Sequence, residues 1–323
     1  MLRVLEAQAV AYMGSSSSKS SSSSSSTPSK PPTTSLSQSD VETRITRARK
    51  IGALDLSNCS HLIALPNNAL DLPALRRIDL SNTSLRTIPI LPEDSLKKLD
   101  FFSASSCKLT GEQPSLANAR TLTQLNLDGN ELLTSMDLSP PGFKLPSSIK
   151  ALTFASCRRL GSIPRCILGK EGALLLCIEK LDLSACGITL LPSSLSAIGS
   201  TLVELILDDN ALSSLGLVSA AKEDIEEKSY EQCTWVAFVK LSTLSVRRNR
   251  LVPSPQSFPS ELFTSTKLAV LSLGGNVSLT ASAVLKLPGC TDFEKRRAAR
   301  VSKGIANDVQ AIDPSFCGLD RTI

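Results

Sequence analysis

A leucine motif recurs through most of the chain and decides what the chain can fold into. The unit L-x-x-L-x-L-x-x-N-x-L occurs without substitution at residues 122–132 and 202–212, and at residues 241–251 with Val246 in place of the third leucine. Six further units carry another residue at the Asn position or one extra residue before the last leucine. The nine units begin at residues 51, 75, 99, 122, 149, 178, 202, 241 and 268, although the third unit could also start at Leu96. Self-similarity at a near-constant spacing indicates a repeat architecture.

Each unit predicts one short strand whose leucines lie at alternate positions and point to one side. A single unit cannot bury that side, whereas stacked units bury a continuous core and expose a row of strands. Aromatic residues make up only 4% of the chain, so leucine, isoleucine and valine must fill this core. The sequence therefore predicts an α/β solenoid over residues 51–280, a curved array of about nine repeats with a concave parallel sheet.

These units resemble those of the leucine-rich-repeat family. In that fold the residue at the Asn position turns inward and hydrogen-bonds backbone groups that would otherwise be buried without a partner. We call these positions the ladder residues. They are Cys59, Thr83, Cys107, Asn130, Cys157, Cys186, Asn210, Asn249 and Asn276.

The cysteine pattern favours a structural role over a metal site or a disulfide framework. Four of the nine cysteines are ladder residues in different repeats, the total is odd, and no C-x-x-C occurs. Reduced thiols are typical of a cytosolic or nuclear protein. We expect no metal and no cofactor.

The segments on both sides of the repeats resemble a narrower group, the small intracellular leucine-rich-repeat proteins of the leucine-rich repeat-containing protein 57 type. Those proteins begin Met-Gly and then carry Val-Glu-Thr, a Lys and a Gly, as do Val41, Glu42, Thr43, Lys50 and Gly52 here. Their C-terminal cap reads Gly-Tyr-x-x-Tyr-x-x-Arg. Its counterparts here are Gly289, Cys290, Phe293 and Arg296. The resemblance implies a non-catalytic, lipid-anchored cytosolic protein.

The first 40 residues are predicted to form a disordered tail. Residues 15–39 are mostly Ser, Thr, Pro and Lys, which cannot bury enough apolar area to offset the entropy of ordering. Within the tail, Met13-Gly14 and the serines after it match the N-myristoylation pattern, which requires the glycine next to the initiator Met. We interpret Met13 as a start and Gly14 as a lipidation site. A single acyl chain would give reversible membrane association, whereas a start at Met1 would leave a spacer.

The remaining segments complete the predicted domain organisation. Residues 41–50 are expected to cap the first repeat. An acidic insert at about 216–240 is interpreted as a helix on the convex side, with a partner-binding lobe as the alternative. Residues 281–304 are expected to form a C-terminal cap helix, whose basic residues could instead contact an acidic membrane surface. Residues 305–323 are predicted to be a flexible tail.

Polar residues at the exposed strand positions are the candidates for binding a partner. They are Asp55, Arg77, Asp79, Asn126, Asp128, Lys180, Asp182, Glu204, Asp208 and Arg247. A solvated sheet face needs polar residues in any case, and Phe101 is the one aromatic residue expected there. Against that reading, a long preorganised concave surface is a common docking site in repeat proteins.

Composition and motifs argue against other classes of function. The net charge of +5 is mild for 323 residues and does not indicate nucleic-acid binding. The chain has one histidine, His61, and no paired carboxylates or activated nucleophile stand out, so we expect neither an enzyme nor a small-molecule substrate. The leading hypothesis is a cytoplasmic protein-binding scaffold or adaptor, peripheral at membranes. A regulatory subunit of an enzyme such as a phosphatase and a ligand-sensing module are the alternatives.

Overall fold

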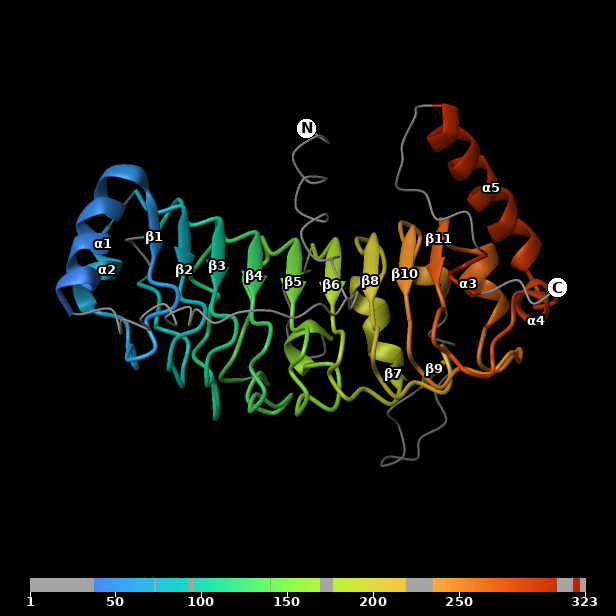
Figure 1. Cartoon of the computed structure of the whole chain (residues 1–323), viewed down its shortest axis with the longest axis horizontal. Coiled ribbons are helices and arrows are strands. Elements are labelled where there is room, and N and C mark those ends of the chain that lie inside the picture. Colours follow the sequence, from blue (N-terminus) through green and yellow to red (C-terminus); the bar gives the residue numbers. More distant parts are fainter. Residues whose placement is uncertain are drawn as a thin grey trace, which may run out of the picture. The chain divides into compact units, whose positions relative to one another are not determined.

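The strands of the chain form one parallel sheet. The computed structural model describes residues 38–306 and 316–319, apart from residues 73, 93–95, 140, 169–176 and 219–234. Within these residues each strand pairs with its neighbour in the order β1-β2-β3-β4-β5-β6-β8-β10-β11 (Figure 1). The bounds are β1 Ala53–Asp55, β2 Arg77–Asp79, β3 Phe101–Ser103, β4 Gln124–Asn126, β5 Ala151–Thr153, β6 Lys180–Asp182, β8 Glu204–Ile206, β10 Thr243–Ser245 and β11 Val270–Ser272.

Every strand of this sheet falls at the same place in the leucine motif, two residues after the start of a predicted repeat. The predicted parallel-sheet solenoid is therefore confirmed. The position of β3 also fixes the register of the third repeat, which begins at Leu99 rather than Leu96. Main-chain hydrogen bonds between repeats continue beyond these three-residue strands, as where the Leu80 N–H donates to the Ser103 carbonyl at 2.8 Å.

The core is built from the leucine positions of the motif. In the seventh repeat Leu202, Leu205 and Leu207 are fully buried. Burial of each such side chain stabilises the fold by roughly 2 kcal/mol. Phe102 and Phe154 occupy the same positions in two other repeats and are also fully buried, so these repeats place aromatic rings in the core.

Each repeat turns sharply just before its ladder residue, where the backbone has a positive φ. The nine residues with this conformation are Asn58, Asn82, Ser106, Gly129, Ser156, Ala185, Asp209, Arg248 and Gly275. The turn sends the ladder side chain inward. Asn130, for example, donates from Nδ2 to the carbonyls of Ala104 and Leu127 at 2.8 and 2.7 Å. One side chain thereby joins the loop of its own repeat to the repeat before it.

Cysteines at the ladder position make the same kind of contact with a single donor. The Cys157 thiol donates to the Leu127 carbonyl at 3.2 Å, and the Cys186 thiol donates to the Phe154 carbonyl at 3.0 Å. Burial raises the pKa of Cys157 to about 12 and also raises the pKa of Cys186. Because these thiols stay protonated at neutral pH, they remain hydrogen-bond donors.

A helix covers the first repeat. Helix α1 spans Gln38–Ile51, so it includes the predicted cap segment 41–50, and Val41, Ile45 and Ala48 are buried against the core. The helix is followed directly by Gly52, which has a φ of 71°. A Cβ added there would lie 2.9 Å from the Ala74 carbonyl oxygen, so both the backbone conformation and the space require glycine.

Short elements connect the strands. They are α2 Asn67–Leu70, a two-stranded sheet of β7 Leu191–Pro192 with β9 Leu217–Val218, and the 3-10 helices Arg165–Ile167, Ser193–Ile198 and Trp235–Ala237.

The predicted acidic insert at 216–240 is described only at its two ends, since residues 219–234 lie outside the described residues. At its C-terminal end Trp235 and Phe238 are buried, with ring centroids 4.7 Å apart. The indole Nε1–H of Trp235 donates to the Leu215 carbonyl at 2.8 Å. The aromatic end of the insert therefore belongs to the core.

Helix α3 Ser260–Thr264 lies between β10 and β11, and two helices follow β11, α4 Ala281–Leu285 and α5 Cys290–Ala306. Phe293 of α5 packs on Phe263 of α3 with ring centroids 5.9 Å apart. Arg296 donates from Nε to the Leu268 carbonyl at 2.8 Å and from Nη2 to the Phe263 carbonyl. These bonds join α5 to the main chain just before β11.

A short segment after α5 is packed against the last repeat, which differs from the flexible tail predicted for 305–323. Phe316 is only 2% exposed, and its ring lies 6.4 Å from that of Phe293. The Leu273 N–H donates to the Cys317 carbonyl at 2.8 Å, just as the Val246 N–H donates to the Ser272 carbonyl one repeat earlier. Residues 316–319 thus supply the backbone acceptor of a next repeat. The other predicted tail residues, 307–315 and 320–323, lie outside the described residues.

Truncating Phe316 should detach this segment. Because Phe316→Ala removes a fully buried ring, we expect the free energy of unfolding to fall by up to about 3 kcal/mol. The Leu273 amide should also lose protection against hydrogen exchange, measured by NMR or mass spectrometry. Val277→Ala, at a side chain that is 98% exposed, is the control and should change neither quantity measurably. Unchanged protection of Leu273 in Phe316→Ala would contradict the assignment.

Candidate functional site

The exposed side of the sheet carries three rows of side chains, which we call the strand face. The rows come from the first and third residue of each strand and from the residue two positions further on. All ten predicted binding residues lie in these rows. Arg77, Lys180 and Glu204 are in the first row, Asp55, Asp79, Asn126 and Asp182 in the second, and Asp128, Asp208 and Arg247 in the third.

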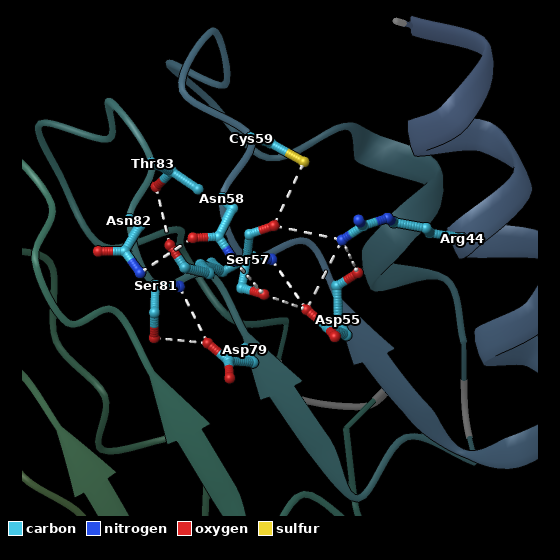
Figure 2. A network of polar contacts seen from close by, with 10 residues as sticks. Arg44, Asp55, Ser57, Asn58, Cys59, Asp79, Ser81, Asn82 and Thr83 are labelled. Atoms are coloured by element: carbon cyan, nitrogen blue, oxygen red, sulfur yellow. Dashed lines mark hydrogen bonds and ion pairs between the residues drawn. The ribbon is translucent and has the colours of Figure 1, made fainter. Parts of the chain in front are cut away.

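Three aspartates of the second row cap the turn that follows their own strand. Oδ1 of Asp79 accepts hydrogen bonds from the Ser81 N–H and hydroxyl at 2.9 and 2.5 Å. Asp55 and Asp182 accept the same pair from the serine two residues later, and Figure 2 shows the first two of these turns. An aspartate that bonds the backbone two residues on stabilises a turn. These carboxylates therefore have a structural role in the repeat.

Arg44 of α1 ties the N-terminal helix to this network. Its guanidinium donates to the carbonyls of Asp55 and Ser57 at 3.1 and 3.2 Å, and it lies 3.7 Å from the Asp55 carboxylate (Figure 2). Burial alone would raise the pKa of Asp55. The bonds from Ser57 and the charge of Arg44 outweigh it and hold that pKa below its usual value.

Third-row acids bind the next repeat instead of their own turn. Asp128 accepts a hydrogen bond from the Ala155 N–H at 2.7 Å. Asp208 accepts from the Arg247 N–H at 2.7 Å and from the Ser245 hydroxyl at 2.6 Å. Their charges are thus partly used to hold neighbouring repeats in register.

Three other charged residues of the face are also paired within it. Lys180 donates to Glu204 at 3.1 Å across β6 and β8, and Arg247 donates to the Ser272 hydroxyl at 3.4 Å. Half-exposed ion pairs of this kind contribute little to stability, typically ~1 kcal/mol or less. They fix where the charges lie on the face.

Arg77 differs from the other candidates. Its guanidinium carbon lies 4.0 Å from the centroid of the Phe101 ring, on the neighbouring strand. The leucine spacing predicts both residues at exposed strand positions, but it does not pair them. The available signal was their shared place in consecutive repeats, since both stand two residues after a repeat start.

The described residues offer no sign of a metal centre or a membrane span. No group of three or more His, Cys, Asp or Glu side chains among them could hold a metal ion. None of the helices seen in this part of the chain is both long and apolar enough to cross a membrane. The eight cysteines that the structure describes are all free thiols. Gly14, the predicted lipidation site, lies outside the described residues.

The repeat motif, one strand per repeat and the inward ladder residues together define a leucine-rich-repeat solenoid. No protein-family model matches the chain, and neither does any curated protein. Among solved structures it is similar to human trophoblast glycoprotein, at 20% identity over 74% of this chain and 75% of that one, with a TM-score of 0.46.

Two bacterial structures are similar in the same way. Internalin C2 of Listeria monocytogenes shares 19% identity over 77% of this chain and 89% of that one, with a TM-score of 0.48. A leucine-rich-repeat protein of Leptospira interrogans shares 21% identity over 76% and 73%, with a TM-score of 0.35. These likenesses concern the fold alone, and we draw nothing about partners from them.

Stability should depend on pH through Asp128. Burial raises the pKa of this carboxyl to about 6, against the opposing effect of the hydrogen bond from the Ala155 N–H. Because the folded state binds the proton more tightly than the unfolded state, this group stabilises the fold most below about pH 4. Its contribution is lost as the pH rises through 6, at a cost of up to about 3 kcal/mol.

Asp128→Asn should flatten this part of the pH profile. The free energy of unfolding, measured with urea between pH 4 and pH 7, should decline in the wild type and decline much less in Asp128→Asn. Asp100→Asn, at an exposed carboxylate, is the matched control and should follow the wild type. Parallel curves for the wild type and Asp128→Asn would show that the carboxyl is not perturbed as described.

Proposed function

We propose that this protein is a non-catalytic scaffold or adaptor that binds a partner protein through the strand face. The observation that carries the proposal is the fixed geometry of that face. Side chains from nine adjacent strands stand in three rows on one side of the sheet, most of them half-buried, and turn, inter-repeat and cross-strand hydrogen bonds hold many of the polar ones. A surface that is already ordered loses little conformational entropy when a partner binds.

Two ion pairs allow charges to be reversed while each salt bridge is kept, so the fold should not change. Lys180 and Glu204 pair across the face, so the double swap Lys180→Glu with Glu204→Lys keeps an ion pair while reversing the local charges. Lys150 and Glu179 form a similar exposed pair at 3.0 Å, just before their strands and outside the three rows. Swapping that second pair is the matched control.

Proximity labelling in cells should separate the two swaps. We expect the face swap to remove at least one labelled partner that the wild type and the control swap both retain, since charge complementarity fixes orientation and register at interfaces. Circular dichroism and thermal melting should show that both variants are folded. If every wild-type partner survives the face swap, binding through this part of the strand face is excluded.

Tethering and location are separate proposals that rest on the sequence pattern. We propose that the protein is cytoplasmic and that acylation of Gly14 gives it reversible contact with membranes. Intact-mass analysis of the protein isolated from its own cells should then find a chain that begins at Gly14 and carries the added mass of one myristoyl group. A mature chain that begins at Met1 without an acyl group rules this out.

A further inference from the structure

Arg77 is the one predicted binding residue whose side chain forms no hydrogen bond or ion pair within the described part of the chain. The other nine each accept or donate at least one hydrogen bond on the strand face. For the exposed Arg77 side chain, the one contact seen among the described residues is the Phe101 ring, which has no hydrogen-bonding group. Its N–H donors therefore face solvent.

Stacking on Phe101 fixes the position of these donors. An arginine over an aromatic ring gains cation–π attraction, about 0.5–1 kcal/mol at an exposed site. The stack also restricts a side chain that would otherwise sample many rotamers, so less entropy is lost when its N–H groups bind. Of the strand face, Arg77 is thus the part best prepared to donate to an incoming group.

The residues around the stack leave it accessible. Along the first row, pairing in register gives the order Ala53, Arg77, Phe101, Gln124, Ala151. Ala53, on one side of the stack, is small, whereas Gln124 separates the stack from Ala151 on the other side. Gln124, which is exposed next to Phe101, adds a neutral donor and acceptor.

The Arg77 guanidinium, which pairs with no acid among the described residues, favours a negatively charged group; of the charged residues next to the stack, Arg76 is basic and Asp100 is acidic. Arg76 is exposed beside Arg77. The acid closest to Arg77 along its own strand, Asp79, has Oδ1 engaged by the N–H and hydroxyl of Ser81. A planar guanidinium matches a carboxylate, to which it can donate two parallel hydrogen bonds.

We infer that the Arg77–Phe101 stack is the anchor of the strand face and binds an Asp or Glu side chain in an extended segment of the partner protein. The carboxylate would accept from the Arg77 guanidinium, with Gln124 positioned to bond the partner's backbone. Apolar atoms of the segment would cover the Phe101 ring. Interface hot spots are commonly built from arginine and aromatic side chains. This inference rests on the proposed function, since it names the chemistry of the partner at the same face.

A displayed library of random 12-residue peptides provides the test. Peptides are selected on the full-length wild-type protein, and the binders are sequenced and synthesised with a fluorescent label. We expect the selected pool to be enriched in Asp and Glu. Fluorescence anisotropy should show binding weakened by about 10-fold to 100-fold in Arg77→Gln, as for the loss of a charge-assisted hydrogen bond. Phe101→Leu should weaken it less.

Two matched controls isolate the interaction. Arg86→Gln removes an exposed arginine of the same repeat outside the strand face and should leave the affinity unchanged. Replacing the acid of the peptide by its amide should weaken binding to the wild type but add little to the loss in Arg77→Gln, because both changes delete one contact. Thermal melting checks that every variant is folded.

The possible failures can be told apart. If the selected peptides carry no acid, or bind Arg77→Gln as tightly as the wild type, the inference is wrong. If those same peptides lose affinity in the Lys180 and Glu204 charge swap, the proposed function still stands. A library that yields no peptide for the wild-type protein, or only peptides that no variant of the face affects, counts against both.

Discussion

The left-handed turn before each ladder residue is the constraint on which the rest of the structure depends. A three-residue strand makes too few hydrogen bonds to hold a repeat in place. The turn aims the next side chain inward, where it bonds carbonyls that have no strand partner, as Asn130 does with Ala104 and Leu127. Without that bond, the buried Ala104 carbonyl would be left unpaired at a cost of about 1–3 kcal/mol. The stacking of repeats, the burial of the core and the regular strand face all depend on these hydrogen bonds between ladder residues and loop carbonyls.

Ladder chemistry varies along the chain and changes how tightly adjacent repeats are joined. Asn210 donates to the Leu183 carbonyl and also accepts from the Ile188 N–H. It therefore binds both a main-chain acceptor and a main-chain donor of the previous repeat. One repeat earlier, Cys186 spans the corresponding gap with its thiol alone, which donates to the Phe154 carbonyl. Asparagine occupies the ladder position in each of the last three repeats, whereas Cys and Thr predominate in the first six. The ladder residues of the last three repeats can therefore form more hydrogen bonds to the preceding repeat than most of those in the first six.

Sequence reasoning located the strands and the inward positions because both follow from a strict spacing of leucines. It also placed the polar rows correctly, but it could not tell which polar groups the fold itself uses. Asp79 and Asp182 look like free acids in the sequence, yet each is bonded by a serine two residues later. The D-x-S spacing was readable as a turn signal. The packing of Phe316 could not be read from the sequence, because it depends on contact with Phe293 and on the open end of the last repeat.

The hydrogen bonds within the repeats limit which groups of the strand face can bind a partner. Carboxylates that already accept from their own repeats keep the turns in shape, so their exchange would disturb the fold before it disturbed binding. Specificity must then come from groups the fold does not use. Arg77 meets that condition, and Phe101 holds it in place without occupying its donors. A regular repeat array can therefore acquire a specific contact by changing two side chains in consecutive repeats while every ladder and turn stays intact.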